Sequence, residues 1–250
     1  MRFRLICLMS SLLISFNVNA LEVCGELKQG ELLVIKDGAK TELIALRRDE
    51  KSPYQFKKIK FDVKKEKWDV QSIKGVAQNK VTPQKTDEAE ILRERRELGK
   101  ALVTKSNLRH DWQKGFIVPV DGAVSGNFGN QRIFNGVPKN PHTGTDIAAN
   151  EGTKVKAAGD GKVLLVGNNY FYSGNVVVLD HGDGLQTIYA HLKETKVKEG
   201  DEVKQGDVIG LVGKTGRATG PHLHWGASVK NVRFRPHSLL DINTKKCRSF

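Results

Sequence analysis

Four histidines and one aspartate lie in three short motifs of the C-terminal half of the chain. These are Pro-His142-Thr-Gly-Thr-Asp146, Tyr-Ala-His191-Leu and Pro-His222-Leu-His224. Residues two or four apart on an extended chain face the same side, so each paired motif presents two side chains to one point. Two imidazoles and one carboxylate form a three-ligand zinc set, which leaves the fourth coordination position for water.

Zinc in such a site supplies the chemistry of hydrolysis. It lowers the pKa of bound water from about 15.7 to about 7, which creates a hydroxide nucleophile at neutral pH. The two histidines outside the ligand set are suited to take the proton and to stabilise the developing oxyanion. Each paired motif alone is a weak signal, but together, 78 to 82 residues apart with His191 between them, they favour a metal site. The sequence has neither a His-Glu-x-x-His motif nor a Gly-x-Ser-x-Gly elbow.

The other three histidines have ordinary surroundings in the sequence. His110 lies next to an aspartate, His181 lies in a Gly-Asp-Gly turn, and His237 follows a proline. We expect each of them to be a surface or turn residue, outside the candidate site.

Over roughly 116–240, these motifs resemble those of the lysostaphin-type (LytM-like) zinc endopeptidases of bacterial cell walls. Gly144-Thr-Asp-Ile-Ala and Gly213-Lys-Thr-Gly-Arg lie between them, and all the motifs follow the family's order. The resemblance implies one Zn²⁺ per chain and a functional endopeptidase. The residues that it assigns are His142, Asp146 and His224 to the metal, and His191 and His222 to catalysis.

The resemblance also implies a substrate. The region 171–181 and the helical connector are similar to those of periplasmic Gram-negative members, which implies peptidoglycan stem peptides cross-linked through D-alanyl–diaminopimelate bonds. Thr215 and Arg217, in a glycine-rich loop beside the metal-binding strand, are candidate substrate-binding residues. Their alternative role is turn formation, and a regulatory partner remains undefined.

Strands separated by glycine turns must position the site. Residues 116–250 hold 19 of the 25 glycines, and their apolar runs show no sustained helical period. This pattern predicts an antiparallel β-sheet or sandwich, with a zinc endopeptidase domain over 116–240 and a C-terminal tail over 241–250. The clearest predicted strands are 162–166, 175–179, 185–191, 207–212 and 221–229.

The preceding part of the chain predicts a second, smaller β unit. Strand-like runs occur at 31–35 and 42–46. Apolar and polar residues then alternate over 58–64, the period of a half-buried strand. A turn over 64–67 would lead into a hairpin partner. We therefore predict a mainly β chain that includes a small N-terminal β-domain over 21–84.

A helical connector is predicted over 85–115. Thr86 is a candidate N-cap, and acidic residues follow it in the first turn. Ile91, Leu98 and Leu102 share one helical face. The remaining charged positions are most simply a solvated face.

Residues 1–20 have the pattern of a secretory signal peptide, with Arg2 and Arg4, an apolar run and a small-residue exit at Ala20. The apolar run is shorter than the about 20 residues of a transmembrane helix, so we expect an exported, periplasmic protein without a membrane span. Cys24 and Cys247 remain after cleavage. An even pair in an oxidising compartment predicts a disulfide, with two unpaired thiols as the alternative.

Composition excludes several classes of protein. Hydrophobic residues make up 38% and charged residues 28%, which excludes a disordered polyelectrolyte and a multi-span membrane protein. The formal charge is +13, and removing residues 1–20 takes away two arginines and no acid, which leaves +11. An exported basic protein meets anionic wall polymers, so we expect no nucleic-acid partner.

Two other functions stay open. A non-catalytic wall-binding or amidase-regulating module fits the same segment if zinc is absent or the groove is blocked. A lipoyl- or biotinyl-like carrier fits the run 197–209, but the carrier lysine motif is missing. A further hypothesis is that the N-terminal domain covers the cleft.

Overall fold

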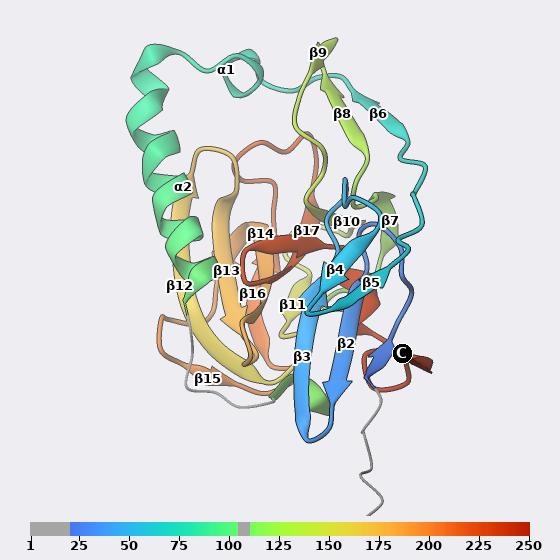
Figure 1. The fold of residues 1–250 in the computed structure, drawn as a ribbon. Helices are drawn as coiled ribbons and strands as arrows, with labels where there is room; N and C mark the ends of the chain where they lie inside the picture. Colours follow the sequence, from blue (N-terminus) through green and yellow to red (C-terminus); the bar gives the residue numbers. More distant parts are fainter. Residues whose placement is uncertain (1–20, 105–110) are drawn as a thin grey trace, which may run out of the picture.

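The computed structural model describes residues 21–104 and 111–250 (Figure 1). The predicted signal peptide and His110 lie outside these residues. Most of the regular structure in the described chain is antiparallel β-sheet, and one long helix lies on the outside (Figure 1). The prediction of a mainly β fold is therefore confirmed. Among the described helices, none is long and apolar enough to cross a membrane.

The largest sheet contains ten strands of the C-terminal half. Its main path runs β15-β12-β13-β14-β17-β10-β7, while β16 pairs with β11 and β14, and β18 pairs with β17. The strands are β7 (Ala123–Gly126), β10 (Gly144–Ala148), β11 (Lys154–Lys156), β12 (Gly161–Tyr170), β13 (Gly174–Asp180), β14 (Leu185–Thr195), β15 (Glu202–Val203), β16 (Val208–Val212), β17 (His222–Val229) and β18 (Val232–Phe234). All five strands that were clearest in the sequence are present, as β12, β13, β14, β16 and β17.

The N-terminal sheet packs through both of its faces. It has the order β19-β1-β2-β3, with β1 (Glu22–Cys24), β2 (Leu32–Asp37), β3 (Lys40–Ala45) and β19 (Cys247–Ser249). Leu32 and Val34 of β2 join the core of the large sheet, whereas Leu33 and Ile35 join a separate cluster on the other face. Alternation along one strand thus buries both faces, because successive side chains point in opposite directions.

The segment that follows departs from the predicted hairpin. Strand β4 (Tyr54–Phe56) pairs with β5 (Ile59–Phe61), so the chain turns before the alternating run and not after it. The backbone after β5 bridges to Lys28 instead of turning back at 64–67. Strand β6 (Val70–Ile73) then pairs in parallel with β8 (Gln131–Phe134), which also pairs with β9 (Val137–Pro138). The predicted hairpin was wrong because β6 finds its partner far along the chain.

The long helix covers one face of the large sheet. After the short helix α1 (Gln78–Val81), a 3₁₀ turn (Lys85–Asp87) leads into α2 (Glu88–Val103). The predicted cap at Thr86 was wrong, since Gln84 and Asp87 form the capping box of that turn. Leu98 and Leu102 pack against Tyr170, Val178 and their neighbours on β12, β13 and β14. Helix α2 is therefore a packed layer of the fold.

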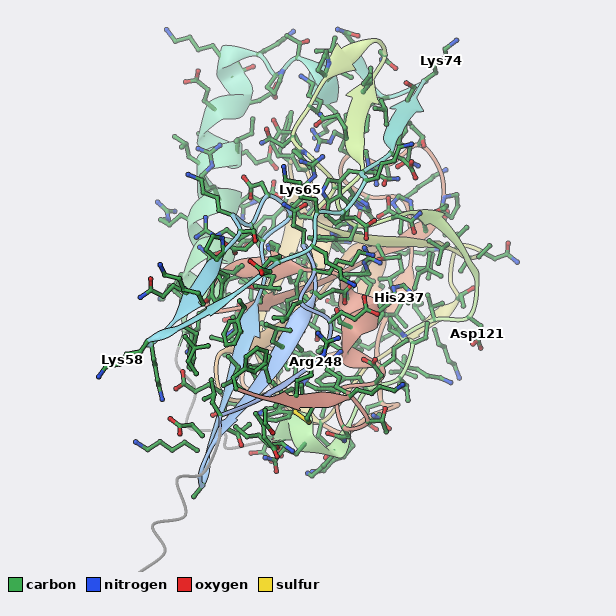
Figure 2. The ribbon with its side chains drawn as sticks, turned by 45° about the vertical axis from the view of Figure 1, so that its right-hand side comes forward. Lys58, Lys65, Lys74, Asp121, His237 and Arg248 are labelled. Carbon is green, nitrogen blue, oxygen red and sulfur yellow. A yellow bond between two sulfur atoms is a disulfide. The ribbon has the colours of Figure 1, made fainter. Side chains whose placement is uncertain are left out.

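The strand near residue 248 pairs with the strand near residue 23. Residues 241–250, predicted as a C-terminal tail, contain β19, which pairs with β1 so that Cys247 lies opposite Cys24. A disulfide joins these two cysteines. The tail is thus an edge strand of the N-terminal sheet. Figure 2 shows the lysine side chains of this part, such as Lys58, Lys65 and Lys74, at the surface.

His181 differs from the expected surface residue. Its side chain is fully buried at the end of β13, with Nδ1 2.6 Å from the Asp160 carbonyl oxygen and Nε2 2.7 Å from Thr187 Oγ1. The 3₁₀ turn Asp111–Lys114 lies over His181, and the His181 carbonyl accepts the Trp112 N–H. The Gly-Asp-Gly turn does follow His181. The local sequence could not predict that the segment Asp111–Lys114 covers the His181 side chain.

Candidate metal centre

Three neighbouring strands bring the predicted site residues together. Strand β10 pairs with β17 so that Asp146 lies opposite His224, and β17 pairs with β14 so that His224 lies opposite Ala190. His222 and His224 project from the same side of β17, while Leu223 between them is buried in the core. This alternation is the one that the sequence predicted.

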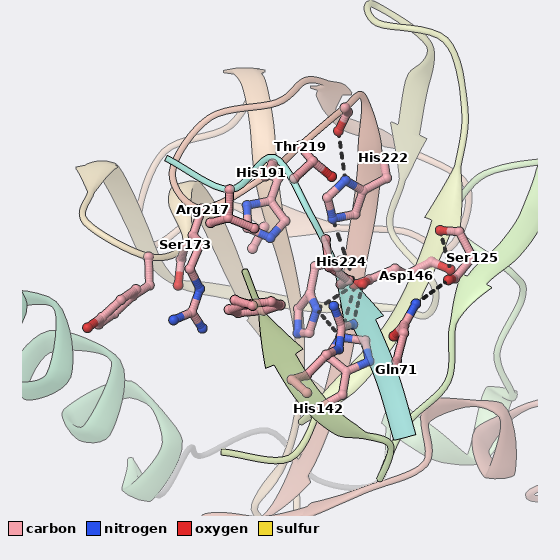
Figure 3. A pocket seen from close by; sticks show the side chains of 18 of the residues that line it. Gln71, Ser125, His142, Asp146, Ser173, His191, Arg217, Thr219, His222 and His224 are labelled. Carbon is pink, nitrogen blue, oxygen red and sulfur yellow. Dashed lines mark hydrogen bonds and ion pairs between the residues drawn. The ribbon is translucent and has the colours of Figure 1, made fainter. Parts of the chain in front are cut away.

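The donor atoms of three side chains converge on one point (Figure 3). Asp146 Oδ1 lies 3.0 Å from His142 Nε2 and 2.9 Å from His224 Nδ1, and the two ring nitrogens are 3.0 Å apart. A tetrahedral zinc ion with ligands at about 2.0–2.1 Å separates its ligand atoms by about 3.3 Å. The spacing and the two-nitrogen, one-oxygen donor set therefore fit a metal ion.

Glycine at position 144 permits this approach. A Cβ atom there would lie 2.5 Å from the Trp225 carbonyl oxygen and 2.7 Å from His224 Nε2. Any side chain would push the His224 ring away from Asp146. The Gly-Thr-Asp sequence thus combines a ligand with the space that the facing ligand needs.

Backbone carbonyls fix the tautomers of three histidines. The Nδ1–H groups of His142, His191 and His222 donate to the carbonyl oxygens of Asn127, Thr215 and Gly220, at 2.9, 2.8 and 2.9 Å. A carbonyl only accepts, so each Nδ1 carries the proton and each Nε2 keeps its lone pair. Such carbonyl partners commonly orient histidines at metal sites.

The charge state of the cluster suits ligation. Burial lowers the pKa of His224 to about 4 and that of His191 to about 3, so both rings are neutral at pH 7. Burial alone would raise the pKa of Asp146, but the adjacent His142 and His224 rings hold it well below its usual range. The site therefore offers neutral nitrogens and an ionised carboxylate at the same pH.

Arg132 is a site residue that the sequence motifs did not indicate. Its guanidinium pairs with Asp146 Oδ2 at 2.6 Å, and both side chains are buried. This bond occupies Oδ2, so Oδ1 faces His142 and His224, and it fixes the plane of the carboxylate. Arg132 lies on β8, which no motif marked, so only the pairing of distant strands reveals it.

His191 and His222 lie next to the ligand cluster. Their ring centroids are 4.7 Å apart, and His191 lies 6.0 Å from the His224 ring. The His191 backbone has a positive φ of 62°, and its N–H donates to the Ser173 carbonyl. A conformation that L-residues rarely adopt is thus supported by the loop before β13.

A pocket of about 530 Å³ lies over these histidines. One wall comes from the N-terminal part, through Gln71, Ile73 and Val76. Figure 3 shows Ser173 and Arg217 across the histidines from Gln71. The pocket is therefore built by segments on both sides of helix α2 in the sequence.

Helix α2 supports the far wall through Glu94. Its buried carboxylate accepts hydrogen bonds from the N–H groups of Tyr172 and Ser173, at 2.8 and 3.0 Å, and from Ser173 Oγ at 2.6 Å. Ser173 in turn accepts the backbone N–H of His191. Glu94 is buried and not on the solvated face predicted for the charged residues of this helix, and no local signal distinguishes it from the other helix carboxylates.

The loop residues Thr215 and Arg217 have different positions. Thr215 Oγ1 donates to the Leu192 carbonyl and accepts the Asn175 N–H, so it is occupied within the loop. The Arg217 side chain lines the pocket. His237, one of the three histidines predicted to lie outside the site, packs against Trp225 and does not line the pocket.

An antiparallel β scaffold that presents a His-Asp-His cluster beside two further histidines defines a metallopeptidase-like protein. Residues 140–236 match the model of peptidase family M23. A solved Pseudomonas aeruginosa protein assigned to peptidase M23 is 30% identical, has a TM-score of 0.56, and is matched over 84% of this chain and 73% of its own. This chain therefore belongs to peptidase family M23, and the resemblance to LytM-like peptidases is confirmed.

Two curated relatives share the same segment. The peptidoglycan DD-endopeptidase ShyA of Vibrio cholerae is 44% identical over 129 residues, which are 50% of this chain and 29% of ShyA. The DD-carboxypeptidase/endopeptidase Mpg of Neisseria meningitidis is 46% identical over 98 residues, which are 39% of this chain and 22% of Mpg. The chain thus spans less than a third of the length of these relatives.

Proposed function

We propose that this protein is a zinc-dependent endopeptidase that hydrolyses peptide cross-links of peptidoglycan. The observation that carries the proposal is the convergence of His142, Asp146 and His224 beside His191 and His222 in one pocket. The names of the M23 relatives ShyA and Mpg support the choice of substrate.

His142 Nε2, Asp146 Oδ1 and His224 Nδ1 hold the ion in this proposal, one per chain. When bound, zinc supplies Lewis acidity, which lowers the pKa of water from about 15.7 to about 7. Arg132 keeps the Asp146 carboxylate in place through its bond to Oδ2. Three protein ligands are the number found in catalytic zinc sites, which leaves one position open.

His191 and His222 act as the general base and general acid in this proposal. Because each Nδ1–H is tied to a carbonyl, each Nε2 is free to accept the proton that water loses as its oxygen bonds to the scissile carbon. The protonated ring then donates to the leaving nitrogen when the C–N bond breaks. The products are a carboxylate and an amine. Thr215 orients His191 through its carbonyl and has a positioning role.

The sequence supports a location outside the cytoplasm and an anionic substrate. The signal-peptide pattern of residues 1–20 supports export to the periplasm, and a mature charge of +11 favours association with an anionic wall polymer. A D-alanyl–diaminopimelate cross-link is the bond expected in that compartment.

Purified protein loaded with one equivalent of Zn²⁺ should convert dimeric, cross-linked muropeptides into monomers, as followed by mass spectrometry. A chelator should stop the reaction, and Zn²⁺ should restore it. Stoichiometric zinc without any cleavage of cross-linked or linear stem peptides would instead support a non-catalytic wall-binding or regulatory module.

A further inference from the structure

Two arginines line the pocket, and they differ in their partners. Arg132 is paired with Asp146. Arg217 has no Asp or Glu partner within the described ranges 21–104 and 111–250. Its guanidinium instead stacks on two aromatic rings, with Cζ 4.4 Å from the Tyr172 centroid and 4.7 Å from the Phe134 centroid.

Stacking on two rings fixes the plane of the Arg217 guanidinium. Contact of Cζ with two aromatic rings restrains the group, while its N–H donors stay available for a ligand. These donors form no hydrogen bond with any other described residue of the chain. Burial lowers the pKa of Arg217 below its usual range, but a guanidinium remains charged at neutral pH. The pocket therefore contains a half-buried guanidinium that has no ion-pair partner among the described residues, with Glu94 as the nearby acidic group that acts on it.

The same loop orients both the cation and a catalytic histidine. The Arg217 backbone N–H donates to the Tyr172 carbonyl at 2.8 Å, and the Thr215 carbonyl accepts from His191 Nδ1 at 2.8 Å. Glu94 holds the facing residues Tyr172 and Ser173 from behind. The position of Arg217 relative to His191 is thus fixed by hydrogen bonds on both sides.

We propose that Arg217 binds a carboxylate of the substrate peptide beside the scissile bond. A planar carboxylate matches the two-donor edge of a guanidinium. The inference rests on the proposed peptidase function and specifies its substrate class. In a D-alanyl–diaminopimelate cross-link, the carbon that bears the scissile nitrogen also carries a free carboxylate. A peptide that ends at that residue presents the same group, so we also expect removal of a C-terminal residue.

The test compares matched stem peptides in three forms. One is the free acid, one carries a carboxamide on the residue after the scissile bond, and one carries a carboxamide on a more distant acid of the stem. The zinc-loaded wild type should cleave the free acid with a kcat/KM about 10- to 100-fold above that of the form amidated on the residue after the scissile bond, and should cleave the form amidated on the distant acid as well as the free acid. A wild type that disfavours only the distant carboxamide overturns the inference.

Arg217→Gln should abolish this preference. Cleavage of the free acid should fall to the level of the disfavoured carboxamide, whose own cleavage should be unchanged. Arg217→Lys should retain part of the preference, because it keeps the charge without the fork. Arg93→Gln is the matched control, since Arg93 stacks on Tyr170 at 5.0 Å outside the pocket lining and should keep the wild-type ratio.

Two negative results have different meanings. Equal cleavage of all three forms by the wild type, or a preference that survives in a folded Arg217→Gln protein, overturns the carboxylate inference and leaves the peptidase function intact. Failure of the zinc-loaded wild type to cleave any form overturns the proposed function and this inference with it.

Discussion

The histidines of the pocket and the residues that support them come from different parts of the chain. The histidine side comes from β10, β14 and β17, which are neighbours in one sheet and lie within the matched family segment. The residues that support these histidines and the pocket walls, Gln71, Arg132 and Glu94, come from β6, β8 and helix α2, outside that segment. Chemistry is thus concentrated in short motifs, while its geometry depends on long-range contacts.

Removing a ligand should have the largest effect. His142→Ala leaves Asp146 and His224 without the third donor, so we expect zinc to be lost and hydrolysis of cross-linked muropeptides to fall by about 1000-fold or more. Metal content by mass spectrometry and product formation measure the two effects together.

His237→Asn is the matched control for that substitution. His237 lies outside the pocket lining, so its loss should leave one zinc per chain and most of the activity. A folded His142→Ala protein with unchanged activity would remove the metal centre from the mechanism.

The scaffold contains a buried histidine that should affect stability. Burial lowers the pKa of His181 to about 4, whereas the unfolded chain takes up this proton near pH 6.5. The unfolded state therefore binds more protons between these values, so stability falls as the pH drops from about 6.5 to about 4. The full loss is about 3 kcal/mol.

Urea unfolding at several pH values measures this contribution. A His181→Gln protein keeps polar groups at the site but does not titrate, so its stability should depend less on pH over this range. If the wild type and the variant lose stability in parallel below pH 6.5, other groups control the acid response.

Much of the histidine side was accessible from the sequence. The spacing of His222 and His224 placed both on one face of a strand, and β17 has that geometry. The ten-strand sheet follows the predicted runs because apolar residues alternate with glycine turns there. The sequence pattern could not pair β6 with β8 or place Arg132 beside Asp146, since neither pairing leaves a local signal. His181 shows the same limit, because its burial depends on a turn near residue 112.

Loss of the support that Glu94 gives should lower kcat more than it changes KM. Glu94→Gln replaces an acceptor of three hydrogen bonds by an amide, which puts an N–H₂ group against the donors of Tyr172 and Ser173. Because Ser173 holds the His191 backbone, we expect kcat to fall by about 10- to 100-fold with KM little changed. Steady-state kinetics on a soluble cross-linked muropeptide measure the split.

Glu97→Gln is the control on the same helix. Glu97 accepts the Tyr170 hydroxyl one turn away and does not contact the 172–173 backbone. Its loss should affect stability without lowering kcat, and Glu94→Asp should recover part of the rate. Equal decreases in kcat for Glu94→Gln and Glu97→Gln would mean that α2 acts only through overall stability.

The smallest effect should come from the wall strand β6. Gln71 donates to the Ser125 carbonyl at 2.8 Å, while its Oε1 is shielded from solvent and has no hydrogen-bond partner within the described part of the chain. Gln71→Ala removes the hydrogen bond that ties β6 to Ser125 and loosens this wall, so KM should rise about 3-fold while kcat stays unchanged. Ser72→Ala, on the opposite and exposed face of β6, should change neither constant. A decrease in kcat as large as that of Glu94→Gln would show that the wall also positions the catalytic residues, and the distinction between the two supports would fail.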